Sequence, residues 1–258
     1  MKIEGAFGPY GQGKTDDKPS LHKRGGLYYL SWSSFYAVSE NVYGPYRYRG
    51  TAIDPAHVSP KFRRDRINLH HDRHGNFFTF KGRWYYAAND FSQPGRTKHC
   101  RDVVMGYVHY RDNGDIAPVR IDETGVGRYD AAQGQIEAED FFEAKGCEER
   151  ECPVGGFELR IRDGGAAHYP NVCNVPAQAA LAISLWGEAD GVLEIREGSP
   201  DGRLLGTAPF RKGRPGYFKK CTATLSGASG TLDLWIAAKG APCHIDWFEF
   251  TGGAPPQM

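Results

Sequence analysis

The chain has 258 residues, enough for one large domain or two of ordinary size. Its 32 basic and 31 acidic residues leave a formal net charge of +1, which argues against a nucleic-acid partner. No window approaches the roughly 18 uninterrupted apolar residues of a membrane-spanning helix. The 33 glycines, 16 prolines and 13% aromatic residues favour many short strands joined by tight turns.

Neither the cysteines nor the N-terminus assigns a cellular compartment. The six cysteines include no Cys-x-x-Cys pair, which argues against a zinc site, and their scattered positions do not establish a disulfide framework. The first residues lack the apolar stretch of a signal peptide. They are polar and glycine-rich and lead directly into a strong strand, so we expect the chain to begin inside a larger protein.

Two aromatic segments dominate the first half of the chain. Residues 26–32 predict a strand that follows a tight turn at Gly25 and Gly26, and residues 82–88 repeat the pattern after another basic residue and turn glycine. A repeat of this length in strand-forming sequence is typical of propeller blades. The alternative is two unrelated hairpins that share aromatic residues.

The second half has a different pattern, and polar, glycine-bearing residues 121–135 predict a linker before it. Short strands with turns every 8–12 residues are typical of a β-sandwich, and neither half shows a convincing helical period. We therefore predict an all-β chain of two domains, residues 1–130 and 135–252. The strands expected in the second domain are 136–141, 180–186, 191–197, 219–225, 231–237 and 244–250.

The first half resembles the later blades of glycoside hydrolase family 43, whose members are five-bladed propellers that act on arabinose- and xylose-containing polysaccharides. The resemblance rests on residues 18–31, 43–50, 74–78 and 80–85, which include His74-Gly75-Asn76-Phe77-Phe78. It implies a partial five-bladed β-propeller. The general-base aspartate of the family, and the aspartate that tunes the acid, have no counterpart in this sequence.

The second half resembles carbohydrate-binding module family 6, a β-sandwich of the jelly-roll, galactose-binding-like type. The matching residues are 136–141, 155–157, 169–172, 194–202 and Ile245-Asp246-Trp247-Phe248. Together the two resemblances imply the C-terminal part of an inverting glycoside hydrolase joined to its binding module. The expected partner is plant cell-wall polysaccharide or oligosaccharide such as xylan, and the parent family is extracellular or periplasmic. The alternative is a non-catalytic carbohydrate-binding protein that retains only the sandwich.

The resemblance also implies a general acid near residues 18–23. An inverting glycosidase needs a protonated carboxyl group for the leaving oxygen and a second carboxylate to activate water. Asp17 occupies the position where the family has a glutamate, although its side chain is one methylene shorter. Glu4, which precedes a glycine, is the competing candidate, and a solvated loop position for both is the third possibility.

Two further residues of the first half match positions that line the family's pocket. His74 matches a histidine of the central channel, which could hold a water beside a calcium ion or hydrogen-bond a sugar hydroxyl. The alternative is an ordinary loop histidine. Arg101 falls where the family often has an arginine near the pocket, and a surface salt bridge is the alternative.

Acidic residues at both ends of the sandwich sequence form a candidate calcium site. Glu137 and Glu139 lie two apart on the strand expected at 136–141, so their side chains should face the same way. Asp246 on the last strand could complete a site of oxygen ligands, which calcium prefers. The resemblance makes this a structural calcium and leaves open a second one in the propeller channel. The alternative is a solvent-facing acidic edge.

Sugar binding by such modules depends on aromatic side chains that stack on the sugar, with a polar group nearby. The candidates are Phe157, or a neighbour, and Tyr217, which follows the turn residues Gly213, Pro215 and Gly216. His244 stands where the family often has an asparagine. Trp186, Trp235 and Trp247 alternate with apolar residues inside strands, which favours core packing.

Overall fold

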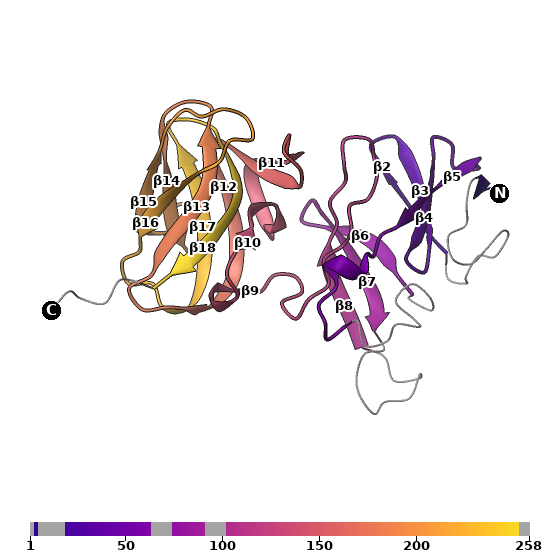
Figure 1. Ribbon diagram of the computed structural model, residues 1–258, viewed down its shortest axis with the longest axis horizontal. Helices are drawn as coiled ribbons and strands as arrows, with labels where there is room; N and C mark the ends of the chain where they lie inside the picture. Colours follow the sequence, from indigo (N-terminus) through magenta and orange to yellow (C-terminus); the bar gives the residue numbers. More distant parts are fainter. Residues whose placement is uncertain (1–2, 5–18, 63–73, 91–101, 253–258) are drawn as a thin grey trace. The chain divides into compact units, whose positions relative to one another are not determined.

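The computed structural model describes residues 3–4, 19–62, 74–90 and 102–252 (Figure 1). The chain divides into two compact units, residues 1–125 and 126–258. The regular structure of the described residues consists of strands and three short 3-10 helices: η2 (Pro55–His57), η3 (Ala131–Gln133) and η4 (Ala138–Asp140). The all-β class predicted from the sequence is therefore confirmed. In the described part of the chain, no helix has the length and apolar character needed to cross a bilayer.

The first unit contains two sheets of mainly antiparallel strands (Figure 1). Both predicted aromatic segments are strands, β3 and β7, and each follows a hairpin turn with two residues at positive φ, Gly25-Gly26 and Lys81-Gly82. One sheet has the order β1-β5-β4-β3-β2 and the other β6-β7-β8. Their bounds are β1 (Ile3–Glu4), β2 (Ser20–Arg24), β3 (Leu27–Trp32), β4 (Phe35–Ser39), β5 (Tyr46–Thr51), β6 (Asn76–Phe80), β7 (Arg83–Asp90) and β8 (Asp102–Tyr107).

One apolar core joins the two sheets of the first unit. Tyr29 of β3 and Tyr86 of β7 are both fully buried in it, with Phe77 of β6 beside Tyr86. A hydrogen bond of 2.7 Å from Ser20 Oγ to Asn76 Oδ1 links β2 to β6. Two antiparallel sheets that share a core in this way agree with the predicted pair of blades.

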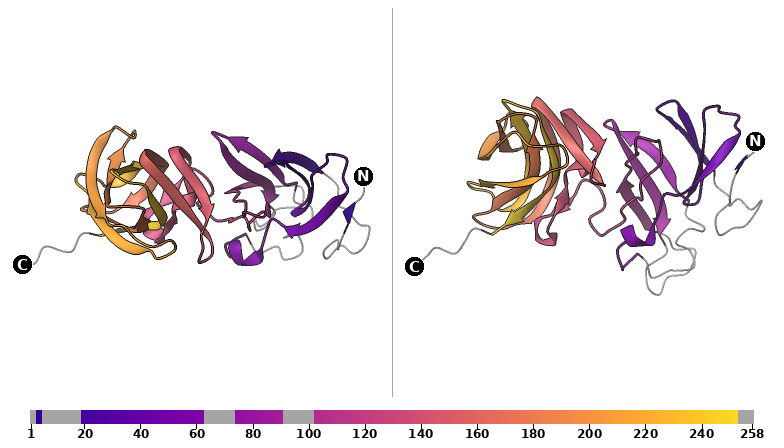
Figure 2. Two further views of the ribbon diagram at one scale, coloured as in Figure 1. Left: turned by 90° about the horizontal axis from the view of Figure 1, so that it is seen from above. Right: turned by 45° about the horizontal axis from the view of Figure 1, so that its top comes forward.

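The second unit is a β-sandwich (Figure 2), and one strand of 19 residues pairs with both of its sets of strands. The strand order is β15-β14-β17-β12-β18-β13-β16, and β12 pairs with β18 over residues 159–161 but with β17 over residues 166–175. Because β12 passes from one set of strands to the other, both sets enclose a single apolar core. The bounds are β9 (Tyr129–Asp130), β10 (Ile136–Glu137), β11 (Glu143–Glu151), β12 (Phe157–Val175), β13 (Ala180–Gly187), β14 (Gly191–Glu197), β15 (Arg203–Phe210), β16 (Lys219–Thr224), β17 (Gly230–Lys239) and β18 (Cys243–Thr251).

The strand predicted at 136–141 is wrong beyond its second residue. Only β10 pairs with β18, and the chain then turns through η4. Two buried tyrosine hydroxyls donate to carbonyls of this turn, Tyr169 to Ala138 at 2.7 Å and Tyr129 to Asp140 at 2.6 Å. These tertiary hydrogen bonds override the alternating pattern, so Glu137 and the η4 residues do not share one strand face.

Two of the three tryptophans predicted to pack in the core, Trp186 and Trp235, are buried, and Trp235 packs with Ala166 and Ala237 in a small apolar cluster. Both lie outside the main core of the sandwich and stack on histidines, Trp186 on His244 and Trp235 on His168. Trp247 is only half-buried. Along these strands the aliphatic neighbours fill the core, so alternation places the indoles on the opposite face.

Candidate functional site

Two loops at one end of the sandwich present large apolar side chains to solvent. Tyr217, in the loop before β16, and Val154, in the loop before β12, are each 68% exposed. The loops touch, because a Cβ atom on Gly216 would lie 3.0 Å from Val154 Cγ1. The structure thus displays the Tyr217 ring outside the core, as its turn-rich surroundings predict.

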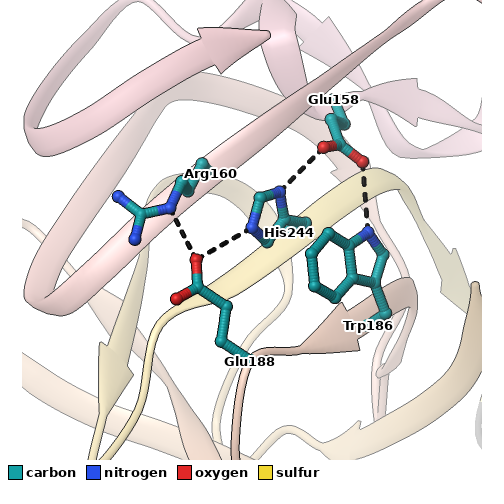
Figure 3. A network of polar contacts seen from close by, with 5 residues as sticks. All are labelled: Glu158, Arg160, Trp186, Glu188 and His244. Carbon is teal, nitrogen blue, oxygen red and sulfur yellow. Dashed lines mark hydrogen bonds and ion pairs between the residues drawn. The ribbon is translucent and has the colours of Figure 1, made fainter. Parts of the chain in front are cut away.

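Beneath this end lies a network of five side chains from three strands and one turn (Figure 3). Nδ1 of His244 lies 2.8 Å from Glu158 Oε1, and its Nε2 lies 3.1 Å from Glu188 Oε1. The Nε–H of Arg160 donates to the same Glu188 oxygen at 2.7 Å. The Trp186 indole N–H donates to Glu158 Oε2 at 3.2 Å, and its ring stacks on His244 at 3.8 Å between centroids. His244 is therefore held on both edges and on one face.

The network keeps a charged carboxylate near the surface. The pKa of Glu188 is lowered chiefly because Arg160 donates to it, with His244 as a further cause, while partial burial acts in the opposite direction. The pKa of Arg160 is raised by the same contact. Glu188 thus stays ionised, and it joins the buried histidine to the exposed rim of the site.

The three predicted sugar contacts differ in their access to solvent. His244 is only 1% exposed, and both of its ring nitrogens already face carboxylates. Phe157 is buried at the start of β12. Tyr217 alone of the three presents its ring to solvent. All three stay predictions as sugar contacts, and the geometry favours Tyr217.

The predicted calcium ligands lie in a crowded acidic region of the same unit. Glu139 is buried, and Glu137 and Asp246 are half-buried. Burial, and then the charge of Glu158, raise the pKa of Asp246. The pKa of the Cys152 thiol is raised mainly by burial and further by the charges of Glu158, Asp246 and Glu139, so these carboxylates act on one thiol.

That arrangement does not by itself form a metal centre. Among the residues that the structure describes, no three His, Cys, Asp or Glu side chains gather closely enough to hold a metal ion. Calcium also accepts backbone carbonyl oxygens, and buried carboxylates of like charge are a setting that a hard cation would stabilise. The calcium site therefore stays a prediction.

The candidate residues of the first unit are placed only in part. Asp17 and Arg101 lie outside the described residues, and Glu4 is described only as a backbone position in β1, paired with Arg47. The backbone N–H of His74 donates to Asn89 Oδ1 just before β6. These four residues stay predictions as site residues.

The sequence analysis missed Glu158, Arg160 and Glu188. Glu158 and Arg160 alternate with Phe157, Leu159 and Ile161 at the start of β12, a pattern that could have revealed a polar strand face bearing opposite charges. Glu188 lies in the turn after β13, where no local pattern marks it.

Comparison with known proteins gives these features a class. Residues 137–252 match the carbohydrate-binding module (family 6). An arabinoxylan arabinofuranohydrolase of Paenibacillus polymyxa is 22% identical over 284 residues, covering 93% of this chain and 43% of that protein. A glycoside hydrolase family 43 arabinoxylan arabinofuranohydrolase from Bacillus subtilis, solved with cellotetraose, is 20% identical with a TM-score of 0.47, over 93% of this chain and 54% of the other. A family 6 carbohydrate-binding module from Clostridium cellulolyticum, solved with xylose, is 27% identical with a TM-score of 0.43. The match covers 45% of this chain and 95% of that module.

These matches confirm both resemblances predicted from the sequence. The chain is similar to xylan-related glycoside hydrolases and to their carbohydrate-binding modules. Residues 137–252 of its second unit match the family 6 carbohydrate-binding module. The described residues form two sheets that share one core in the first unit, followed by a β-sandwich in the second. The chain spans between 20% and 43% of the length of the curated relatives that it matches.

Proposed function

We propose that the second unit binds xylo- or arabino-oligosaccharide segments of plant polysaccharide at the end of the sandwich that carries Tyr217. The observation that carries the proposal is the exposed Tyr217 ring beside Val154. A flat aromatic ring offers an apolar face to the C–H groups of a sugar, and its hydroxyl can reach a sugar oxygen or water. One exposed ring can cover only one or two sugar rings, so we expect weak binding.

The choice of sugar is supported by what the similar proteins are. The relatives include a β-xylosidase of Xylanibacter ruminicola and an endo-1,4-β-xylanase of Thermoclostridium stercorarium. Their names refer to β-xylosides and to 1,4-β-xylan, which agrees with a binding unit for that class of polysaccharide.

We further propose that the first unit belongs to an inverting glycosidase that acts on arabinofuranosyl or xylosyl linkages. The similarity to the Paenibacillus polymyxa arabinofuranohydrolase supports this, because it extends over 93% of this chain and so includes the first unit. Asp17 is the proposed general acid and Glu4 its alternative, with His74 and Arg101 as substrate contacts. A binding protein without catalysis is the competing function.

Titration calorimetry with the full chain tests the binding function. Xylo- and arabino-oligosaccharides are titrated into the wild type, Tyr217→Ala and Tyr43→Ala. Tyr43 is 84% exposed in the first unit and serves as the matched control. We expect about a tenfold loss of affinity for Tyr217→Ala, the usual scale for an aromatic anchor, and none for Tyr43→Ala. Equal affinity in all three proteins would remove Tyr217 from the site, and a wild type that binds neither sugar would refute the function.

A further inference from the structure

His244 cannot serve as the polar group of a sugar site in this arrangement. Its side chain is enclosed by Trp186, Glu158 and Glu188, and it contacts a carboxylate through each ring nitrogen. A sugar on the Tyr217 loop needs hydrogen-bonding partners other than this imidazole, because its ring oxygen and hydroxyls lose water on binding. These partners must be polar groups at this end of the sandwich whose atoms are not already used in hydrogen bonds within the protein.

Glu188 and Arg160, the two network members nearest the surface, have such atoms (Figure 3). Glu188 uses only Oε1 for His244 and Arg160, and Arg160 uses only Nε for Glu188. Within the described part of the chain, Glu188 Oε2 and the two terminal guanidinium nitrogens make no hydrogen bond. Their side chains are 36% exposed for Glu188 and 20% for Arg160. One free acceptor and a fork of free donors therefore stand side by side at the surface.

The same backbone segment carries this pair and the Tyr217 loop. The N–H of Gly213 donates to the carbonyl of Gly187 at 2.9 Å, directly before Glu188. A Cβ on Gly213 would lie 2.9 Å from Trp186 Cβ, so this loop rests on the indole that the network holds. Glu188 and the base of the Tyr217 loop thus lie together at one end of the sandwich.

We infer that Glu188 and Arg160 are the hydrogen-bonding pair of the sugar site, with the Glu188 carboxylate accepting from one hydroxyl and the Arg160 guanidinium donating to its neighbour. The inference rests on the proposed function and deepens it. Charge-assisted bonds of this kind are roughly twice as strong as neutral ones. His244 acts as a positioning residue, because it fixes the Glu188 carboxylate before the ligand arrives and so lowers the ordering cost of binding.

The surroundings of the pair favour a neutral sugar over an acidic one. Glu158, within the network, and Asp246 add negative charge near the pair, and both charges contribute to the raised pKa of the Cys152 thiol. The carboxylate of a uronic acid would be repelled by the Glu188 carboxylate and by these negative charges. A pentose hydroxyl, in contrast, can both donate to Glu188 and accept from Arg160. The substrate class is therefore an uncharged pentose oligosaccharide.

The test is xylotetraose titrated into the full chain and into Glu188→Gln, Arg160→Gln, Arg160→Lys and Arg211→Gln. Arg211 forms an ion pair with Asp190 at the same end of the sandwich, at 2.6 Å and largely exposed, and is the matched control. We expect Glu188→Gln and Arg160→Gln each to weaken binding by about tenfold. Arg160→Lys should recover part of the loss, and Arg211→Gln should bind like the wild type. Melting curves identify any variant that is unfolded, and the partial recovery by lysine separates ligand contact from a structural role.

Two results would overturn the inference. Wild-type affinity in Glu188→Gln and Arg160→Gln, together with a loss in Tyr217→Ala, would remove the pair from the site and leave the proposed function standing. An equal loss in Arg211→Gln would show that only the overall charge of this end matters. A wild type that does not bind xylotetraose would refute the inference and the proposed function together.

Discussion

The two units bury a histidine in opposite ways. His22 of the first unit stacks on Tyr29 at 4.7 Å between centroids and has one hydrogen-bonding partner, the Tyr110 hydroxyl at 2.7 Å. His244 of the second unit lies between two carboxylates. Both histidines are at least nine-tenths buried.

The difference shows what each unit can present to a ligand. Around His22 the aromatic side chains turn inward and form the core, and the pKa of the histidine falls to about 4 because burial disfavours its charged form. Around His244 the charges continue outward through Glu188 and Arg160 to the rim. The second unit therefore joins a buried network to an exposed aromatic loop, and the first unit keeps its described aromatic cluster inside.

The largest expected effect concerns catalysis, and it tests whether the first unit does chemistry of its own. We expect very low glycosidase activity from this chain, because the sequence offers no counterpart of the general-base aspartate and each acid–base step contributes about 10²–10⁴-fold. Hydrolysis of nitrophenyl arabinofuranoside and xyloside measures it. Efficient hydrolysis that disappears in Asp17→Asn or Glu4→Gln would contradict the prediction and identify the acid.

The next prediction breaks the ionic network from within. Glu158→Ala removes the hydrogen-bonding partner of His244 Nδ1 and of the Trp186 indole N–H, and leaving these two buried groups unpaired costs about 1–3 kcal/mol for each. We expect the free energy of unfolding of the second unit to fall by that amount in denaturant titrations. Glu249→Ala is the control, since Glu249 pairs with the exposed Lys220 and should change stability by less than about 1 kcal/mol. If both variants lowered the free energy of unfolding equally, the buried hydrogen bonds of His244 would contribute no more to stability than an exposed ion pair.

The sequence predicts the fold better than the network, and the reason is sequence separation. The strand expected at 191–197 is β14 residue for residue, and those at 180–186, 219–225, 231–237 and 244–250 match their strands within a few residues. By contrast, His244 lies 86 residues from Glu158 and 56 from Glu188. Only the pairing of β12, β18 and β13 brings these side chains together, and no local pattern encodes that pairing.

The strands that the sequence analysis missed have a different cause. β12 is 19 residues long and contains Gly164, Gly165, Pro170 and Asn171, which are typical turn residues. In the structure they lie at irregularities of one continuous strand, where its register with its neighbours shifts and Gly164 and Asn171 have positive φ. Pairing with neighbouring strands therefore keeps these residues in one continuous strand, although their local sequence indicates turns.

The aromatic burial of His22 predicts a specific sensitivity to acid. With an ordinary pKa of 6.5 and a folded value near 4, the unfolded state binds a proton more readily. Stability is therefore complete above about pH 6.5, falls as the pH drops toward 4, and changes no further below that through this group. The loss is about 3 kcal/mol.

The measurement compares wild type with His22→Phe. Denaturant titrations between pH 7 and 4 should show a steeper decline for the wild type, because phenylalanine keeps the stacking but cannot titrate. The other histidines and the carboxylates contribute equally to both proteins and cancel in the difference. Parallel curves across this range would mean that His22 is protonated as easily in the folded protein as in the unfolded chain.

The smallest effect concerns calcium, and it would add a second ionic feature to the second unit. If Glu137, Glu139 and Asp246 contribute to a site, calcium at a hundredfold excess over its dissociation constant should stabilise the folded state by about 2.7 kcal/mol. Melting the full chain in calcium and in EDTA measures the shift. A double variant, Glu139→Gln with Asp246→Asn, should lose the response to calcium. Burial and the charge of Glu158 raise the pKa of Asp246 when no cation is bound, so the neutral asparagine should also relieve repulsion between the carboxylates. A shift that persists unchanged in the double variant would place any calcium elsewhere, and identical melting with and without EDTA would leave these carboxylates as a half-buried acidic edge.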